Sequence, residues 1–350
     1  MSPPMLAAVL HGSRDLRIEE RPVPVPGPGQ VLLRVRRAGL CGSDLHYYSE
    51  GRCGLFVPTV PFVLGHELVG EVAALGDGVR QPAVGQRVAV NPARSCGRCE
   101  DCRGGRGNLC RHVVMLGSAS TQPPTDGAFC QYLALGAGQC VPVGPGVDDG
   151  VAAMMEPLAV ALHAAHRAGD VTGKRVLVTG GGPIGLLAVV AARARGARTV
   201  ALSDPLESRR ALALRVGADA ALDPTAASFP DDAVRLAGEG FEVALEASGA
   251  PPALRQALGA VRRGGTVVQI GTFAEPEVAL PANLLMSREL QYVGSFRYGD
   301  VFGEGARLLA SSGALLRPLV SQVFPFVAVS RALDAALQRD TSVKVQIDLL

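Results

Sequence analysis

The spacing of apolar and polar positions changes twice along the 350 residues, which divides the chain into three regions. In residues 1–155, short apolar runs alternate with turn residues, as in QVLLRVRRAG, LVGEVAALG and GAFCQYLAL. Such short alternating runs are typical of half-buried strands. This region is therefore predicted to be a β-rich domain with long loops.

Residues 156–295 follow a different pattern, in which continuous apolar runs alternate with segments of helical periodicity. The apolar runs are RVLVTG, TVALSD, FEVALEAS, GGTVVQIG and LQYVGSF, and the helical segments include IGLLAVVAARARGA and SRRALALRVGA. Strands that alternate with helices predict an α/β domain with a doubly wound parallel sheet. Residues 296–350 return to the mixed pattern and end in the strand-like VKVQIDLL.

The composition excludes several function classes. Apolar residues make up 48% and charged residues 19%, and the net charge of +2 gives no general attraction to nucleic acid or to an anionic membrane. The longest apolar stretch, residues 176–192, is interrupted by GGGP and is short for a membrane span. With no signal-peptide pattern at the start, we expect a cytoplasmic protein, in which clustered cysteines more often bind metal than form disulfides.

A glycine motif opens the second region. VLVTGGGPIG places Gly180, Gly182 and Gly185 in a G-x-G-x-x-G pattern, with Pro183 and Ile184 between the last two glycines. The motif alone is weak in a glycine-rich chain, but here it follows an apolar strand and begins an apolar helix. That context predicts a dinucleotide-binding turn, in which the helix N-terminus holds the pyrophosphate.

The cofactor preference depends on Asp204, which ends the next predicted strand about twenty residues later. A carboxylate at this place accepts hydrogen bonds from the adenosine ribose and repels a 2′-phosphate, which favours NAD over NADP. Asp204 could equally cap the following helix. Arg209 and Arg210 lie close enough in sequence to soften the preference, so use of NADP stays open.

Four cysteines lie within fifteen residues, with the spacing C-x₂-C-x₂-C-x₇-C over residues 96–110. Four thiolates form a closed tetrahedral Zn²⁺ site, which is a structural site. A [4Fe–4S] cluster would have a shorter last spacing and a trailing proline, and a nucleic-acid-binding zinc knuckle would carry aromatic residues. The candidate ligands of this structural zinc are Cys96, Cys99, Cys102 and Cys110.

A second set of candidate residues is dispersed over GLCGSDLHYY (39–48), LGHELVGEV (64–72) and MMEPLAVALHAAH (154–166). A lone Cys, His or Glu is usually structural. Together with the four-cysteine loop, GGGPIG, GSFRY and the terminal KVQ, however, these segments resemble the zinc-containing medium-chain alcohol and polyol dehydrogenases over the whole length. Within that family, the chain is most similar to the sorbitol and L-idonate 5-dehydrogenase branch.

The resemblance implies a GroES-like catalytic domain, residues 1–155 and 296–350, that encloses a Rossmann domain at 156–295. It implies a catalytic zinc on Cys41, His66 and a glutamate, so that the chain would carry two zinc ions. The glutamate is either Glu67 or Glu156, and the sequence leaves that choice open. Zinc would act as a Lewis acid on the substrate hydroxyl, while Ser43 and His46 would carry its proton to solvent.

The same resemblance implies residues for substrate and cofactor. Those for the substrate are Tyr47, Glu156, Arg297 and Tyr298, and those near the nicotinamide are Ile270, Gly271, Thr272, Phe296 and Arg297. The implied reaction transfers hydride from a secondary alcohol of a sugar acid or polyol to NAD, with L-idonate first, sorbitol or xylitol as the alternative and a primary alcohol less favoured. A homodimer or homotetramer is expected. A catalytically silent nucleotide-binding protein is the remaining alternative, and retention of the dispersed set argues against it.

Overall fold

The computed structural model describes residues 4–349, which form two compact units. One unit contains residues 4–156 and 302–349, and the other contains residues 157–301. The second unit is therefore inserted into the first, which confirms the predicted fold class. The chain returns to the first unit at residue 302, whereas the sequence pattern places this return near residue 296.

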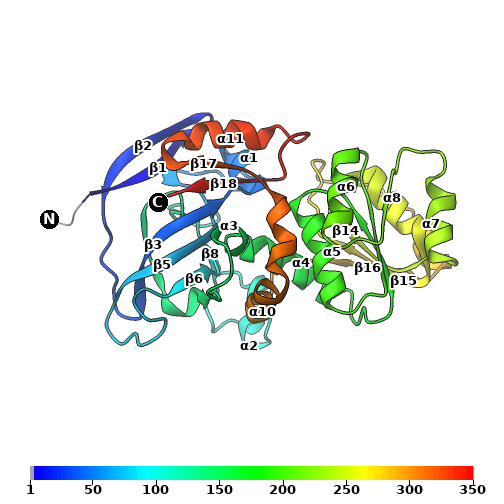
Figure 1. The fold of residues 1–350 in the computed structure, drawn as a ribbon, viewed down its shortest axis with the longest axis horizontal. Coiled ribbons are helices and arrows are strands. Elements are labelled where there is room, and N and C mark those ends of the chain that lie inside the picture. The colour runs from blue at the N-terminus through cyan, green and yellow to red at the C-terminus, as the bar shows by residue number, and fades with distance from the viewer. Residues whose placement is uncertain (1–3, 350) are drawn as a thin grey trace. The chain divides into compact units, whose positions relative to one another are not determined.

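The first unit is built mainly from antiparallel strands (Figure 1). Its largest sheet has seven strands in the order β10-β6-β5-β3-β18-β17, with β9 also paired to β3, and smaller sheets are β2-β1-β4 and β7-β8. The C-terminal strand β18 pairs with β3, some three hundred residues away, so the last segment belongs to this unit. The strands are β1 (Pro4–Gly12), β2 (Asp15–Pro22), β3 (Gln30–Gly39), β4 (Phe62–Val63), β5 (Glu67–Leu75), β6 (Arg87–Val90), β7 (Ala93–Arg94), β8 (Val114–Met115), β9 (Tyr132–Gly136), β10 (Cys140–Pro142), β17 (Val320–Pro325) and β18 (Lys344–Asp348).

Short helices connect and cover these strands. The α-helices are α1 (Gly42–Glu50), α2 (Glu100–Arg103), α3 (Asp149–Ala152), α10 (Phe302–Ser312) and α11 (Val329–Leu337), and α4 (Met155–Arg167) leads into the second unit. The 3₁₀ helices are η1 (Gly107–Leu109), η2 (Ala137–Gln139), η3 (Gly313–Leu319) and η4 (Phe326–Ala328).

The second unit is a six-stranded parallel sheet in the order β13-β12-β11-β14-β15-β16. Side chains alternate between its two faces: Leu177 of β11 packs with helices α7 and α8, whereas Val176 and Val178 lie on the other face. The strands are β11 (Arg175–Thr179), β12 (Thr199–Ser203), β13 (Ala220–Leu222), β14 (Phe241–Glu246), β15 (Val261–Gln269) and β16 (Gln291–Gly294). The helices are α5 (Pro183–Ala194), α6 (Glu207–Arg215), α7 (Phe229–Ala237), α8 (Pro251–Ala260) and α9 (Ala282–Ser287).

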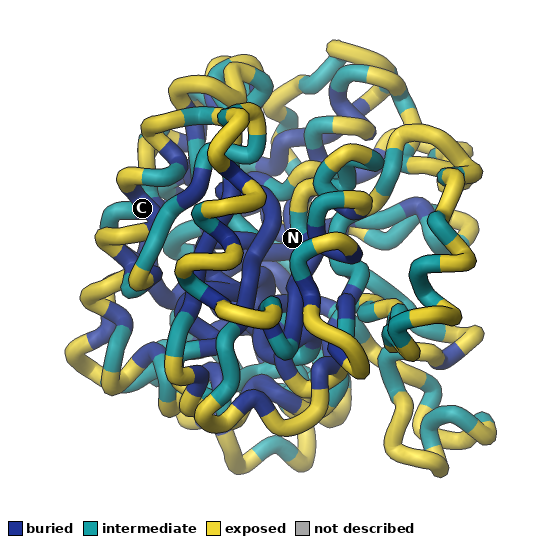
Figure 2. Tube along the Cα trace, turned by 90° about the vertical axis from the view of Figure 1, so that its right-hand side faces the viewer, coloured by how far each residue is buried: buried dark blue, intermediate teal, exposed yellow. Residues whose placement is uncertain are grey.

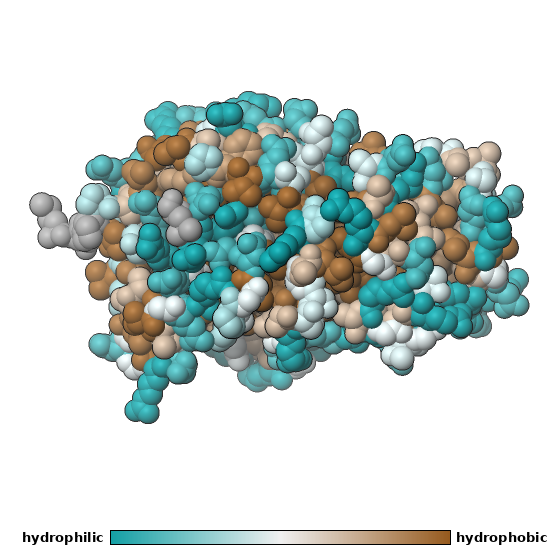
Figure 3. All heavy atoms as spheres, viewed as in Figure 1, coloured by the Kyte–Doolittle hydropathy of each residue, from teal (hydrophilic) through white to brown (hydrophobic). Residues whose placement is uncertain are grey.

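Burial follows this arrangement. Figure 2 shows buried segments in the interior and exposed segments along the outer loops, and on the face seen in Figure 3 polar residues surround small groups of apolar ones. In the described part of the chain, no helix combines the length and the apolar character needed to cross a membrane. The predicted apolar stretch at 176–192 is instead strand β11, the glycine turn and most of helix α5.

Candidate metal centres and cofactor site

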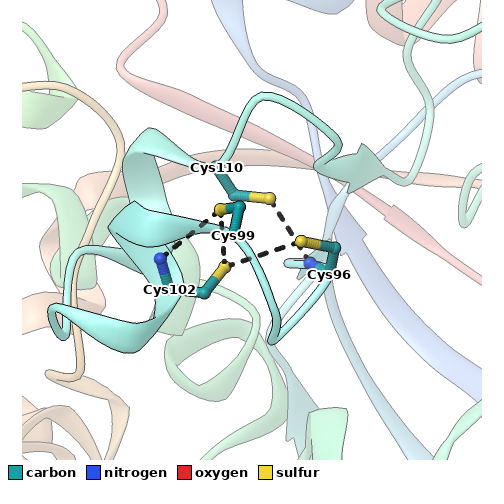
Figure 4. A group of neighbouring side chains, drawn as sticks. All are labelled: Cys96, Cys99, Cys102 and Cys110. Carbon is teal, nitrogen blue, oxygen red and sulfur yellow. Dashed lines mark hydrogen bonds between the residues drawn. The ribbon is translucent and has the colours of Figure 1, made fainter.

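The four-cysteine loop brings all four sulfur atoms together (Figure 4). Cys99 Sγ lies 3.4 Å from Cys102 Sγ, and Cys96 Sγ lies 4.0 Å from Cys102 Sγ. These separations are too long for a disulfide bond. A tetrahedral zinc site with Zn–S bonds near 2.3 Å has sulfur atoms about 3.8 Å apart, so the observed spacing fits zinc.

The backbone of the loop also favours thiolates. The amides of Cys96 and His112 donate to Cys110 Sγ, both at 3.3 Å, and the amide of Cys102 donates to Cys99 Sγ at 3.5 Å. Backbone N–H groups of Arg98 and Cys99 lower the pKa of Cys96 to about 6. Donors aimed at sulfur stabilise its charged form, which is the form that binds metal.

The second candidate metal cluster joins three residues from two segments of the first unit. Cys41 is the N-cap of helix α1, His66 directly precedes β5, and Glu67 is the first residue of β5. One ligand atom from each lies within 4.8 Å of the others. Zinc bound by S, N and O donors would place them about 3.3–3.8 Å apart, so small side-chain adjustments would complete a zinc site.

Glycines allow this close approach. A Cβ at Gly39 would lie 2.3 Å from Oε2 of Glu67, and a Cβ at Gly65 would lie 2.4 Å from the ring of Phe129. Gly65 also has a φ of +95°, which glycine adopts readily. A larger residue at either position would require its neighbour to move, and at Gly65 it would also strain the backbone.

Asp44 connects the two backbone segments of the cluster through hydrogen bonds. Its carboxylate is fully buried and accepts hydrogen bonds from the amides of Cys41 at 2.9 Å and Gly65 at 3.1 Å. One carboxylate oxygen also lies 3.8 Å from Nδ1 of His66. Asp44 thus fixes the backbone on both sides of the cluster, and its charge lies near the His66 ring at a distance longer than a hydrogen bond. Such carboxylate partners of a metal-binding histidine tune its orientation and basicity.

Lys344 provides the only described lysine ammonium near the cluster. Its Nζ donates to both carboxylate oxygens of Glu67 at 2.7 Å and to the carbonyl of Leu40 at 3.1 Å. Both side chains are almost completely buried. A buried charge of this kind is costly unless it is paired, so the contact ties β18 to β5.

Glu156 lies in the first turn of helix α4, buried beside the same cluster. Burial raises the pKa of Glu156 to about 7, and His66 opposes this shift. Burial lowers the pKa of His66, but the charges of Cys41, Asp44 and Glu156 outweigh it and raise that pKa well above its usual value. The negative groups that favour a proton on His66 equally favour a bound cation. The chemistry of the donor set therefore fits zinc.

Helix α1 places the other predicted residues of this region. Ser43 lies in its first turn, and exposed His46 has Nδ1 2.8 Å from Oε1 of Glu50. Tyr47 is buried, its hydroxyl accepts a hydrogen bond from the amide of Ala119 at 3.0 Å, and its ring packs edge-on against Phe62. These contacts show how Tyr47 holds the helix; its contact with substrate stays a prediction.

The glycine motif lies at the carboxyl end of β11, beside the point where the strand order reverses between β11 and β14. A Cβ at Gly180 would lie 2.8 Å from Ser248, and a Cβ at Gly185 would lie 1.8 Å from the carbonyl oxygen of Gly180. At Gly182, the N-cap of α5, the position of a Cβ is open. Pro183 and Ile184 form the first turn of α5. This is the arrangement that lets a pyrophosphate approach the helix N-terminus.

Asp204 follows β12 at the same edge of the sheet. One carboxylate oxygen accepts from the amide of Gly181 at 2.6 Å, and the other accepts from the amide of Leu206 at 2.8 Å. Arg209 is buried in α6, and Arg210 donates to the carbonyls of Asp204 and Pro205, both at 2.8 Å. Asp204 thus accepts from the backbone before α6, as a helix cap does, and also from the glycine turn. Its contact with the adenosine ribose stays a prediction.

The remaining predicted residues lie in two loops of the second unit. Ile270, Gly271 and Thr272 follow β15, and the amides of Ile270 and Gly271 donate to the carbonyl of Glu246. Phe296, Arg297 and Tyr298 follow β16, where Arg297 has a φ of +54° and its guanidinium lies 4.8 Å from the centre of the Phe296 ring. A left-handed arginine is strained, which is common at functional sites.

Three buried charged residues were not identified from the sequence: Asp44, Lys344 and Glu246. Asp44 had a local signal, since it is three residues after the N-cap Cys41, as in a capping box. Lys344 lies in the KVQ segment, which carried the resemblance without a role. Glu246 ends a predicted strand, where polar residues of a parallel sheet gather.

Comparison with known proteins agrees with this geometry. Residues 27–145 match the alcohol dehydrogenase GroES-like domain, and residues 183–311 match the zinc-binding dehydrogenase family. The chain is 38% identical over 345 residues to sorbitol dehydrogenase of Bacillus subtilis, covering 98% of this chain and 97% of that protein. The chain therefore belongs to the zinc-binding dehydrogenase family, as predicted.

Two further relatives bear on the reaction. L-idonate 5-dehydrogenase (NAD(P)(+)) of Escherichia coli K12 is 36% identical over 343 residues, covering 97% of this chain and 98% of that protein. The crystal structure of the L-idonate 5-dehydrogenase from Escherichia coli superposes with a TM-score of 0.92 at 35% identity, covering 100% of this chain and 99% of that one. A short chain alcohol dehydrogenase from Escherichia coli CFT073, complexed with NADH, superposes with a TM-score of 0.88 at 28% identity over 99% of each chain.

Proposed function

We propose that this dehydrogenase oxidises a secondary alcohol of a sugar acid or polyol with NAD, and that L-idonate is its first candidate substrate. The full-length similarity to sorbitol dehydrogenase and to L-idonate 5-dehydrogenase supports the reaction class. L-idonate is placed first because the guanidinium of Arg297 can hold a carboxylate through two hydrogen bonds. Sorbitol or xylitol is the second candidate, favoured by 38% identity to a sorbitol dehydrogenase. A primary alcohol is less favoured, because Glu67 and Glu156 both lie beside the cysteine ligand, as in the polyol branch.

In this proposal Cys41, His66 and Glu67 hold the catalytic zinc, because their ligand atoms lie within 4.8 Å of one another, with Glu156 as the alternative carboxylate ligand. The four-cysteine loop holds the structural zinc. When bound, zinc supplies a Lewis acid for the substrate hydroxyl and NAD accepts the hydride. Asp44 fixes the backbone at Cys41 and beside His66, and Lys344 keeps the charge of Glu67 compensated. Glu156 adjoins these ligands and, with Tyr47, Arg297 and Tyr298, is assigned to the substrate.

The chain also supplies a path for the hydroxyl proton. Ser43 is assigned as the first acceptor and His46 as the next, because both lie on α1 directly after Cys41. His46 is exposed and its Nδ1 contacts the exposed carboxylate of Glu50, so a proton that reaches His46 can pass to solvent. In the second unit, Gly180 to Gly185, Asp204 and Arg209 are assigned to the adenosine and pyrophosphate. Ile270 to Thr272, Phe296 and Arg297 are assigned to the nicotinamide.

We assign the protein to the cytoplasm and expect a homodimer or homotetramer. Support for association comes from β16, which forms the edge of the six-stranded sheet and pairs on one side only within the described chain. An unprotected edge strand is a common site of subunit pairing.

The test is a comparison of kcat/KM for L-idonate, sorbitol, xylitol and ethanol, with NAD and with NADP, on zinc-loaded protein. L-idonate with NAD should give the highest value. Replacing Arg297 with Lys should lower kcat/KM more for L-idonate than for sorbitol, by about ten- to a hundredfold, because a point charge does not replace a planar fork. If the wild type strongly prefers sorbitol or xylitol, the substrate assignment changes from a sugar acid to a polyol.

A further inference from the structure

Glu246 has no role in the reaction described above, yet its carboxylate lies at the edge of the sheet where dinucleotides bind in doubly wound folds. It ends β14, next to the reversal of strand order between β11 and β14, and is fully buried. The neighbouring strands β11 and β15 end at the same edge of the sheet. Dinucleotides bind outside this edge in doubly wound sheets.

In each of its recorded hydrogen bonds, the Glu246 carboxylate is the acceptor. Oε1 accepts from the amide of Ser248 at 2.8 Å, the amide of Gly249 at 3.1 Å, the hydroxyl of Ser248 and the hydroxyl of Thr179 at 3.4 Å. Oε2 accepts from Nε2 of Gln269. A carboxylate has only acceptors, so an ionised Glu246 matches this set of donors and an amide in its place would not.

The orientation of Gln269 is fixed from its other side. Its Nε2 also donates to the carbonyl of Gly271 at 2.6 Å, and its Oε1 accepts from the hydroxyl of Tyr292 at 3.0 Å. The amide group must therefore present its N–H groups to Glu246. The donors come from three adjacent segments: the end of β11, the loop after β14 and the end of β15.

These segments touch one another with no room for an added methyl group. A Cβ at Gly180 would lie 2.8 Å from Ser248, a Cβ at Gly271 would lie 2.3 Å from the amide nitrogen of Gly249, and a Cβ at Gly249 would lie 2.3 Å from the carbonyl of Thr272. The position of each loop therefore depends on the others. The Glu246 side chain receives hydrogen bonds from all three segments.

We propose that Glu246 is a positioning residue for the dinucleotide. Its carboxylate sets the spacing of residues 179–182, 247–250 and 269–272, which hold the first glycine of the turn and the residues assigned to the nicotinamide. The inference rests on the proposed use of NAD. It assigns Glu246 no contact with substrate and no proton transfer.

The test replaces Glu246 with Gln, which has nearly the same shape but turns an N–H group toward other donors. NADH fluorescence titration should show a dissociation constant raised about tenfold. Amide hydrogen exchange without cofactor should be faster in residues 247–250 and 269–272. The matched control is Glu242→Gln at the other end of β14, where the carboxylate pairs with Arg175; its NADH affinity should equal that of the wild type.

If E246Q does not fold, Gln269→Leu removes one donor and should weaken binding about threefold. Unchanged NADH affinity and hydrogen exchange in E246Q or Q269L would overturn the inference. Failure of the wild type to bind NADH would instead overturn the proposed function, and with it the site that Glu246 supports.

Discussion

Lys344 and Glu67 form a buried ion pair across 277 residues of sequence, with Nζ 2.7 Å from each carboxylate oxygen. The pair joins the C-terminal strand of the chain to the strand that begins at the candidate zinc ligands. The last segment of the first unit therefore contacts a candidate ligand of the catalytic zinc.

Replacing Lys344 with Met should destabilise the protein by about 3–5 kcal/mol when zinc is removed by a chelator, because Glu67 would keep an unpaired buried charge. The loss should be smaller with zinc bound, since a cation among Cys41, His66 and Glu67 compensates the same charge. Thermal unfolding with and without chelator measures the difference. Lys174, the only other lysine, provides the control Lys174→Met, for which zinc should not change the effect. If Lys344→Met lowers stability equally with and without chelator, Lys344 does not compensate the same charge as the bound zinc.

The two zinc sites should respond differently to mutation. Cys99→Ser should lower stability and zinc content, because a closed four-thiolate site contributes to folding. Cys41→Ser should abolish activity and leave a folded protein that still binds NADH. Zinc analysis of each variant, with circular dichroism, provides the readout. A wild type with one zinc per chain and four freely reactive thiols at residues 96–110 would contradict the two-site assignment.

Asp204 should set the cofactor preference. Asp204→Ala removes the charge that would face a 2′-phosphate, so kcat/KM should fall with NAD and rise with NADP. The variant also loses the hydrogen bonds to Gly181 and Leu206, which adds to the loss with NAD. Equal values for both cofactors in the wild type would show that Asp204 does not discriminate, and would direct attention to Arg209 and Arg210.

Glu242 gives the second unit a dependence on pH. The hydrogen bond from Arg175 lowers the pKa of Glu242 to about 2, below the usual value of 4.5. A lowered pKa in the folded state stabilises the fold above about pH 4.5, and this contribution disappears as the pH falls toward 2. Glu242→Gln should therefore cost about 2–3 kcal/mol at pH 7, about half as much at pH 3 and little at pH 2. Melting temperatures of both proteins across that range test this; a constant difference would contradict it.

The sequence was sufficient for features whose signal is local. The apolar strands, the helices between them and the G-x-G-x-x-G turn each occupy consecutive residues, and the structure confirms the parallel sheet they predict. The four cysteines of the loop also lie close in sequence, so their meeting was expected from spacing alone.

Contacts between segments distant in the sequence could not be predicted from local sequence patterns. Lys344 meets Glu67 only because β18 pairs with β3 and β3 pairs with β5, which no local pattern of the last strand indicates. The hydroxyl of Tyr47 accepts from the amide of Ala119, a contact between residues 72 apart in the sequence that no local pattern indicates. Glu246 likewise becomes a shared acceptor only when three strand ends come together in the sheet.

Removal and return of zinc tests the central claim most directly. Protein treated with a chelator should form no NADH from L-idonate, sorbitol or xylitol, as followed by absorbance at 340 nm, and added zinc should restore the rate in the wild type but not in Cys41→Ser. Full activity in protein shown to lack zinc, or no NADH formation from any secondary alcohol in protein that carries two zinc ions, would contradict it.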